Sequence, residues 1–386
     1  MTSISDFEIE NGVLKKYRAN SAEVYIPEGV TEIGKNAFLG KTGIQKIHFP
    51  ESLEKISDSA FSPCPAITEL TFPSRLQSIG EEAFSGCYNL KNLTFPENLK
   101  EIGKRAFYAC VEITSVSIPP RVTIGNEAFC GCTGLVRSKF IVINGILFDC
   151  YSYEETIEIP EGVTEISSNA FEKCKRMTEL RFSDSVKKIR TGAFATCEAL
   201  KTVRLNEGLE EIESDAFYNC RALSHVQFPT TLTNIGERAF LACAQLKGLS
   251  VPSSECKIGS YAFGGCMGLQ DENGLVILNH ILFGYFKTEA NVTIPADVTV
   301  IGRDAFSWNT NLLSVQLPEG LTEIGEHAFL YCAKLTHINI PETVKIIGSN
   351  AFFGCAGLKS LHIPKSVTKI GSGAFYGCEE PIFETT

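Results

Sequence analysis

The stretch Ile79-Gly80-Glu81-Glu82-Ala83-Phe84-Ser85-Gly86-Cys87 is the clearest copy of a motif that returns along the whole chain. The motif is Ile-Gly-x-x-Ala-Phe-x-x-Cys, and most neighbouring copies are 23 residues apart. Its fourteen copies are marked by their phenylalanines: Phe38, Phe61, Phe84, Phe107, Phe129, Phe171, Phe194, Phe217, Phe240, Phe263, Phe306, Phe329, Phe352 and Phe375. A unit of this length cannot bury its own apolar face, whereas stacked copies can. The period therefore predicts a solenoid.

A short strand is expected after each copy of the motif. Residues 90–96 read Leu-Lys-Asn-Leu-Thr-Phe-Pro, in which apolar and polar residues alternate before a proline ends the segment. Equivalent strands pair into one parallel sheet with a spacing of about 4.8 Å. The repeat phenylalanines then point inward as a column. Opposite charges at Glu165, Lys188 and Glu211, one per coil, favour this stacking.

Glycine is common at the second motif position, where it would permit a positive φ. Ser57, Ser167, Arg190 and Glu213 occupy the same position in other coils. A positive φ is therefore not required there.

Two longer gaps divide the repeats. They lie between Phe129 and Phe171 and between Phe263 and Phe306. Each gap holds a turn between apolar runs, Asn144-Gly145 or Asn279-His280, and Asn11-Gly12 stands in the same relation to the first repeat. Such sequences predict β-hairpins. We therefore expect one continuous solenoid over residues 1–386 with three sub-modules, 7–139, 140–274 and 275–386, each a hairpin followed by five, five and four repeats.

The first hairpin is expected to pair Glu10 with Val13, Ile9 with Leu14 and Glu8 with Lys15. This register leaves one charged face, which suits a cap at the open end of a repeat stack. The other two hairpins are mainly apolar on both faces, as Val142 and its neighbours indicate, and are expected to pack between coils.

Composition excludes several function classes. The chain has 386 residues, a net charge of −10 and a pI of about 5.3. This charge disfavours nucleic-acid binding, which needs a basic surface. No apolar run approaches the roughly 18 residues of a membrane span, and the first residues do not resemble a signal peptide. We expect a cytoplasmic monomer without membrane insertion.

Twelve of the fifteen cysteines lie three residues after the repeat phenylalanine, and only Cys130, Cys150 and Cys256 do not. Disulfide frameworks usually show unequal spacings and an even count. A metal site usually shows Cys-x-x-Cys, to which Cys130-x-Cys132 comes closest. The favoured interpretation is a column of buried, reduced thiols that act as small hydrophobes, with disulfides and a metal site as alternatives.

The complete repeat, Leu-x-x-Ile-x-Ile-Pro-x-x-Val-x-x-Ile-Gly-x-x-Ala-Phe-x-x-Cys, resembles the BspA-type (Treponema-type) leucine-rich repeat family over about residues 7 to 380. The resemblance implies a curved leucine-rich-repeat solenoid with a parallel sheet on its concave side and turns on its convex side. Members are commonly surface or secreted adhesion proteins of bacteria, so it also implies a cell-surface or secreted location as the alternative.

No catalytic constellation or cofactor motif stands out, and we expect no enzyme activity, cofactor or metal. Histidines occupy exposed strand positions, and His337 and His362 on neighbouring coils are the nearest approach to a metal pair. Trp308 replaces a glycine in a coil that lacks the cysteine, and we interpret it as filling extra space in an irregular coil, with an exposed binding anchor as the alternative.

The outward strand positions are the predicted ligand surface. Arg181 and Arg204 are adjacent there, next to Glu179 and Thr202, and paired arginines can hold a carboxylate. The simpler alternative is a solvated, salt-bridged face. The candidate binding residues are Arg181, Arg204, His225, Gln227, His337 and His362. We predict a protein-interaction scaffold, with a bacterial adhesin or carbohydrate-binding module as the second hypothesis.

Overall fold

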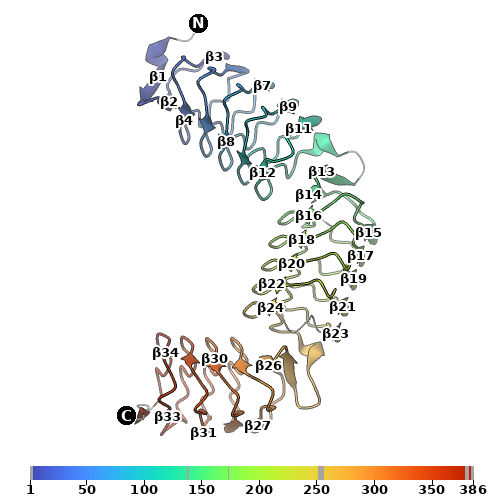
Figure 1. Ribbon diagram of the computed structural model, residues 1–386, viewed down its shortest axis with the longest axis vertical. Coiled ribbons are helices and arrows are strands. Elements are labelled where there is room, and N and C mark those ends of the chain that lie inside the picture. The colour runs from blue at the N-terminus through green and yellow to red at the C-terminus, as the bar shows by residue number, and fades with distance from the viewer. Residues whose placement is uncertain (1–2, 137–138, 173, 251–255, 379–381, 384–386) are drawn as a thin grey trace. The chain divides into compact units, whose positions relative to one another are not determined.

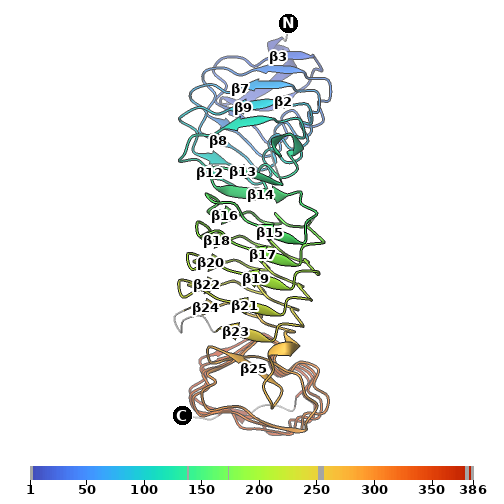
Figure 2. The ribbon, with the colours of Figure 1, turned by 90° about the vertical axis from the view of Figure 1, so that its right-hand side faces the viewer.

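A computed structural model describes residues 3–136, 139–172, 174–250, 256–378 and 382–383. It forms two compact units, Met1–Glu154 with Pro160–Cys174, and Glu155–Ile159 with Lys175–Thr386. Each unit is a stack of coils joined by parallel strand pairing, which confirms the predicted solenoid (Figure 1, Figure 2). In the described residues the only helical elements are three short 3-10 turns: η1 (Ile4–Asp6), η2 (Thr133–Leu135) and η3 (Met267–Leu269). The division into three sub-modules stays a prediction.

Each stack carries two parallel ladders on opposite sides of the coils (Figure 1). The front ladder contains the strands that precede the proline position. In the first unit these are β3 (Glu23–Tyr25), β5 (Lys46–His48), β7 (Glu69–Thr71), β9 (Asn92–Thr94) and β11 (Ser115–Ser117). In the second unit they are β15 (Thr156–Glu158), β17 (Glu179–Arg181), β19 (Thr202–Arg204), β21 (His225–Gln227), β23 (Gly248–Ser250), β27 (Asn291–Thr293), β29 (Ser314–Gln316), β31 (His337–Ile338) and β33 (His362–Ile363), with β35 (Ile382–Phe383) beside β33.

The isoleucine ladder contains two-residue strands that end at the repeat isoleucine. In the first unit these are β4 (Glu32–Ile33), β6 (Lys55–Ile56), β8 (Ser78–Ile79), β10 (Glu101–Ile102), β12 (Thr123–Ile124) and β16 (Glu165–Ile166). In the second unit they are β18 (Lys188–Ile189), β20 (Glu211–Ile212), β22 (Asn234–Ile235), β24 (Lys257–Ile258), β28 (Val300–Ile301), β30 (Glu323–Ile324), β32 (Ile346–Ile347) and β34 (Lys369–Ile370). The sequence predicted only the front ladder, because two residues are too few to show alternation.

Charge pairing along the isoleucine ladder follows the predicted pattern where it is described. Lys188 and Glu211 are direct partners in register, and Lys188 Nζ lies 2.9 Å from the Glu211 carboxylate. The same ammonium lies 2.7 Å from Glu213. Neighbouring coils thus place opposite charges together, which adds modestly to stacking because the pair is partly exposed.

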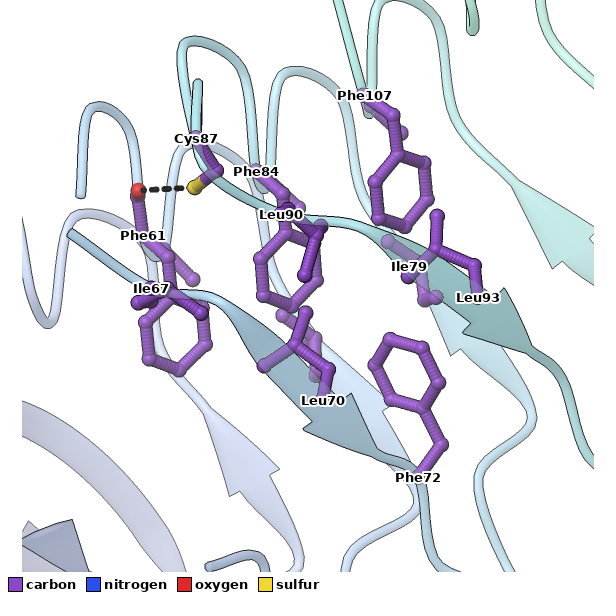
Figure 3. Packing of buried hydrophobic residues seen from close by; sticks show 14 of the residues in the cluster. Phe61, Ile67, Leu70, Phe72, Ile79, Phe84, Cys87, Leu90, Leu93 and Phe107 are labelled. Atoms are coloured by element: carbon purple, nitrogen blue, oxygen red, sulfur yellow. Dashed lines mark hydrogen bonds between the residues drawn. The ribbon is translucent and has the colours of Figure 1, made fainter. Parts of the chain in front are cut away.

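The repeat phenylalanines form the centre of the core, as predicted (Figure 3). Phe61, Phe84 and Phe107 are fully buried, and their rings stack at centroid distances of 5.0 Å and 5.2 Å with an interplanar angle of 6°. A second aromatic row meets this column edge-on, as Phe72 does against Phe84 at 5.9 Å. Stacked and edge-on ring pairs are both favourable arrangements of aromatic quadrupoles.

The repeat cysteines are buried beside this column, as predicted, except Cys378, which is partly exposed. The Cys87 thiol donates a hydrogen bond to the backbone carbonyl of Phe61 in the preceding coil, at 3.5 Å (Figure 3). Cys110 repeats the contact with Phe84 at 3.2 Å. Burial raises the pKa of the Cys64 thiol to about 12. It likewise raises the pKa of the Cys87 and Cys110 thiols, so these side chains are protonated and poorly nucleophilic.

Close approach between neighbouring coils explains the glycines at the second position of the motif. A Cβ on Gly103 would lie 2.6 Å from the carbonyl carbon of Gly80 in the preceding coil. Glycine is favoured there by close approach between coils, and a positive φ is not required, as the sequence indicated. The left-handed residue lies two positions later, as at Glu82 and Arg105, both with φ of 53°.

Three antiparallel hairpins occur: β1 (Phe7–Glu10) with β2 (Val13–Tyr17), β13 (Phe140–Ile143) with β14 (Ile146–Cys150), and β25 (Leu275–Leu278) with β26 (Ile281–Tyr285). The second strand of each pairs in parallel with the next strand of the isoleucine ladder. The hairpins thus start stretches of the ladder and are not separate insertions in it.

The predicted register of the first hairpin is correct at Glu10–Val13 and Ile9–Leu14 and wrong at Glu8. Glu8 pairs with Lys16, not Lys15, because a β-bulge adds one residue to β2. The bulge allows both Leu14 and Tyr17 to be fully buried. In the second hairpin Val142 is 41% exposed, so one face is less buried than its apolar residues indicated.

Candidate functional site

The front face is the outward side of the front ladder, and its first and third strand positions point away from the core. In β19 the middle residue Val203 is buried, whereas Thr202 and Arg204 on either side are not. The same alternation recurs in β17 and β21. The side chains at the first and third strand positions therefore form two rows on this face, and within each row neighbouring side chains are one coil apart. Packing in the core does not restrict which residues occupy these rows.

The predicted arginine pair lies on β17 and β19 of the five-stranded sheet β15-β17-β19-β21-β23. Arg181 and Arg204 are direct cross-strand partners. Arg181 is held by two carboxylates, with Nη1 2.9 Å from Glu158 and Nε 3.0 Å from Glu179. Its hydrogen bond lowers the pKa of the Glu179 carboxyl and in turn raises the pKa of Arg181. Arg181 is therefore largely neutralised within the protein.

Arg204 is the more available of the two arginines. Its side chain is 68% exposed, and its Nε lies 3.4 Å from Glu179, a carboxylate that Arg181 contacts more closely. A guanidinium offers five N–H donors in a planar fork, so donors of Arg204 remain free for a ligand carboxylate. The salt-bridged alternative thus describes Arg181 better than Arg204.

His225 and Gln227 on β21 extend the same surface. Thr202 pairs with His225, and Arg204 pairs with Gln227. The His225 ring lies over Gly248 of the next strand, 3.4 Å from where a Cβ on that glycine would be, and its Nδ1 is 3.0 Å from the Ser224 hydroxyl. Four of the six predicted binding residues therefore gather on three neighbouring strands.

The remaining two lie on front strands of adjacent coils, but these two strands belong to different hydrogen-bonded sheets. His337 on β31 pairs with Ser314, whereas His362 on β33 pairs with Ile382. The order β27-β29-β31 ends before β33, so strand pairing does not fix the distance between these histidines, and their neighbour relation stays a prediction. Among the described residues, no group of three or more His, Cys, Asp or Glu side chains is arranged to hold a metal ion.

His337 instead borders a hollow of about 410 Å³ on the front face, together with Gln316, Thr336, Asn339 and Ser360. The first unit has a smaller hollow of about 230 Å³ on its own front face, beside His48 and Thr71. Polar hollows on this face therefore occur in both units.

Sequence reasoning missed a cluster at the start of the first front ladder. The rings of Tyr25 and His48 stack at 4.1 Å with an interplanar angle of 2°, and His48 Nε2 lies 2.8 Å from the Glu23 carboxylate. The hydrogen bond to His48 lowers the pKa of Glu23. The sequence feature that could have revealed this cluster is the presence of two ring-bearing residues at the same strand position in adjacent coils.

Comparison with known proteins gives the family. The model for the BspA type leucine-rich repeat region matches in six copies, over residues 8–136, 142–270 and 277–383. No helix in the described part of the chain is long and apolar enough to cross a membrane. A search of curated proteins gives no match.

The chain is similar to solved structures of three leucine-rich repeat proteins. A leucine-rich repeat protein from Bacteroides ovatus is 26% identical, with a TM-score of 0.33, over 92% of this chain and 76% of its own. One from Eubacterium ventriosum is 20% identical, with a TM-score of 0.41, over 95% and 88%. A leucine-rich cell surface protein from Faecalibacterium prausnitzii is 23% identical, with a TM-score of 0.35, over 100% and 93%. With its fourteen stacked repeats, the chain belongs to the BspA-type leucine-rich repeat family.

Proposed function

We propose that the chain is a non-enzymatic scaffold that binds a protein partner on the front face of β17, β19 and β21. The carrying observation is the exposed Arg204 guanidinium beside Gln227 and His225. These side chains supply hydrogen-bond donors at one-coil spacing on a rigid backbone. Donors arranged in this way suit an acidic segment of a partner, because charge-assisted hydrogen bonds to carboxylates are stronger than neutral ones.

The test is affinity capture from a lysate of the source organism with wild-type protein and with an Arg181→Ala/Arg204→Ala variant. The matched control is Lys187→Ala/Lys257→Ala, which removes two positive charges of the same unit away from the front face. The proposal expects a partner that the wild type and the control retain and that the arginine variant loses. A partner retained equally by all three proteins would place binding elsewhere.

Salt dependence separates the charged contact from general adhesion. Purified partner is expected to bind less tightly as the salt concentration rises, because Arg204 is exposed and its interactions are screened. The Arg204→Ala variant should show a weaker dependence. Equal salt dependence of wild type and variant would count against an arginine–carboxylate contact.

For the location of the protein we propose the cytoplasm, with the cell surface or secretion as the alternative. Reduced thiols suit a reducing compartment. Native protein unfolded without reductant is expected to present all fifteen cysteines to a thiol reagent. Oxidation of most of them would contradict both the reduced column and the cytoplasmic location, and would favour the surface.

A further inference from the structure

Four consecutive coils carry an exposed or half-buried aromatic ring on the turn that follows the repeat phenylalanine. These are Trp308, Tyr331, Phe353 and Tyr376, which we call the aromatic ladder. Their ring centroids lie 4.3 Å, 5.4 Å and 5.0 Å apart in that order. Trp308 is 64% exposed and Tyr376 is 70% exposed. The interpretation from sequence that Trp308 fills space inside an irregular coil is therefore wrong.

The fold does not require aromatic residues at these turn positions. Equivalent turns in other coils carry Ser85-Gly86, Ala195-Thr196 and Gly264-Gly265. The next coil also makes room for the ladder, since a Cβ on Gly354 would lie 2.5 Å from the ring of Tyr331. The Tyr331 ring therefore fits in this place because the neighbouring residue, Gly354, has no side chain.

The left-handed backbone at this turn is a feature of the repeat. Trp308 has a φ of 61° and Tyr331 a φ of 56°, in the left-handed region that side chains rarely adopt. Gly86 and Gly265 take positive φ at the same turn position in other coils. Ala109, Thr196 and Ala242 take the same conformation, with φ of 57°, 59° and 63°, so the repeat imposes it whatever the residue. The ladder coils differ from these in the aromatic side chain that the turn presents to solvent.

We propose that the aromatic ladder binds a neutral, linear polysaccharide. The site is a strip one ring wide, whereas a stable protein interface needs about 800 Å² on each partner. Three of the four turns, 307–310, 330–333 and 353–356, contain no charged residue, and the fourth, 376–379, contains only Glu379. This low charge favours a neutral ligand. Trp308 and Tyr376 are three coil spacings apart, or roughly 14 Å. That length requires an oligomer to contact both.

The recognition chemistry is stacking of sugar C–H faces on the exposed ring surfaces, with the sugar hydroxyls left in water or bonded to the polar turn. Trp308 and Tyr376 supply the most exposed ring surface at the two ends, and Tyr331 and Phe353 support them in between. This surface lies outside the front face, so the inference does not depend on the protein partner proposed above.

Trp308 emission provides a direct probe, because it is the only tryptophan in the chain. The protein is titrated with cello-, xylo-, malto- and chito-hexasaccharides and with the matching monosaccharides. A saturable change with one hexasaccharide and a much weaker one with its monosaccharide is expected. Tyr376→Ala should weaken binding roughly tenfold, whereas Tyr153→Ala, at an 80% exposed tyrosine elsewhere, should not change it.

A second variant separates binding from structure. Trp308→Gly restores a residue that other coils use at this turn, so it should unfold at the same temperature as wild type or higher while calorimetry shows that hexasaccharide binding is lost. Three results would overturn the proposal: no hexasaccharide alters the Trp308 emission, binding survives both ladder variants, or Trp308→Gly unfolds at a markedly lower temperature. Loss of a captured protein from Trp308→Gly, without sugar binding by wild type, would likewise replace it with a protein site.

Discussion

Two columns of aromatic rings run along the coils of the second unit. Their ring spacing is nearly the same, but they differ in burial and in the number of coils that they occupy. The inner column, with Phe217 and Phe240 at 5.0 Å, recurs in all its coils and is fully buried except at Phe375 in the last coil, which is partly buried. The aromatic ladder has nearly the same ring spacing, is largely exposed, and occupies four coils only. The rings of the inner column pack against one another and are removed from water. The ladder leaves its two end rings in solvent.

The difference indicates which positions the solenoid needs. A residue that recurs in every coil must satisfy the same packing environment each time, so it reports on the fold. A residue that departs from the repeat while remaining exposed is free of that constraint. We expect the first class to affect stability and the second to affect binding.

Phe217→Ala should have the largest effect. The side chain is fully buried between Phe194 and Phe240, at 5.1 Å and 5.0 Å, and its loss leaves a cavity that the stacked coils cannot close. The free energy of unfolding should fall by about 3–5 kcal/mol. Urea denaturation measures it, and an unchanged midpoint would show that the column does not hold the coils together.

Gly348→Ala should follow. Its new Cβ would lie 2.4 Å from the backbone nitrogen of Glu326, so adjacent coils must move apart. We expect a loss of about 2–3 kcal/mol. Gly320→Ala in the preceding coil is the matched control, because its Cβ would meet nothing closer than 3.8 Å. Equal effects at both glycines would contradict the close-approach explanation.

Cys87→Ala should cost less, at about 1–2 kcal/mol. The substitution removes a small buried side chain and its hydrogen bond to the Phe61 carbonyl. The same denaturation measurement applies, and Cys378→Ala at the partly exposed end of the column should cost less still. A larger loss at Cys378 than at Cys87 would be inconsistent with burial as the source of the effect.

Much of the fold was predictable because the repeat presents the same evidence many times. The inward phenylalanines, the buried thiols and the strands before the proline all recur, so irregular single coils did not obscure them. The isoleucine ladder was missed because each of its strands has two residues. The Glu8–Lys16 pairing was missed because a bulge leaves no sign in the alternation near the turn.

The site was less predictable, for a geometric reason. Arg181 and Arg204 share a strand position, so counting along the repeat placed them together. The ladder rings do not share a position: Trp308 and Tyr331 stand two residues after the repeat phenylalanine, and Phe353 and Tyr376 stand one residue after it. Counting separates them, and only the packing of the turns shows that they form one row.

The central claim is tested most directly by urea unfolding of wild type, Phe217→Ala and Trp308→Gly side by side. Trp308→Gly loses a ring contact worth about 0.5–1.5 kcal/mol and gains relief of left-handed strain of about 1–2 kcal/mol. Its free energy of unfolding should therefore stay within about 1 kcal/mol of wild type, while that of Phe217→Ala falls by about 3–5 kcal/mol. Comparable destabilisation by the two substitutions would show that both columns hold the fold, and would contradict the account.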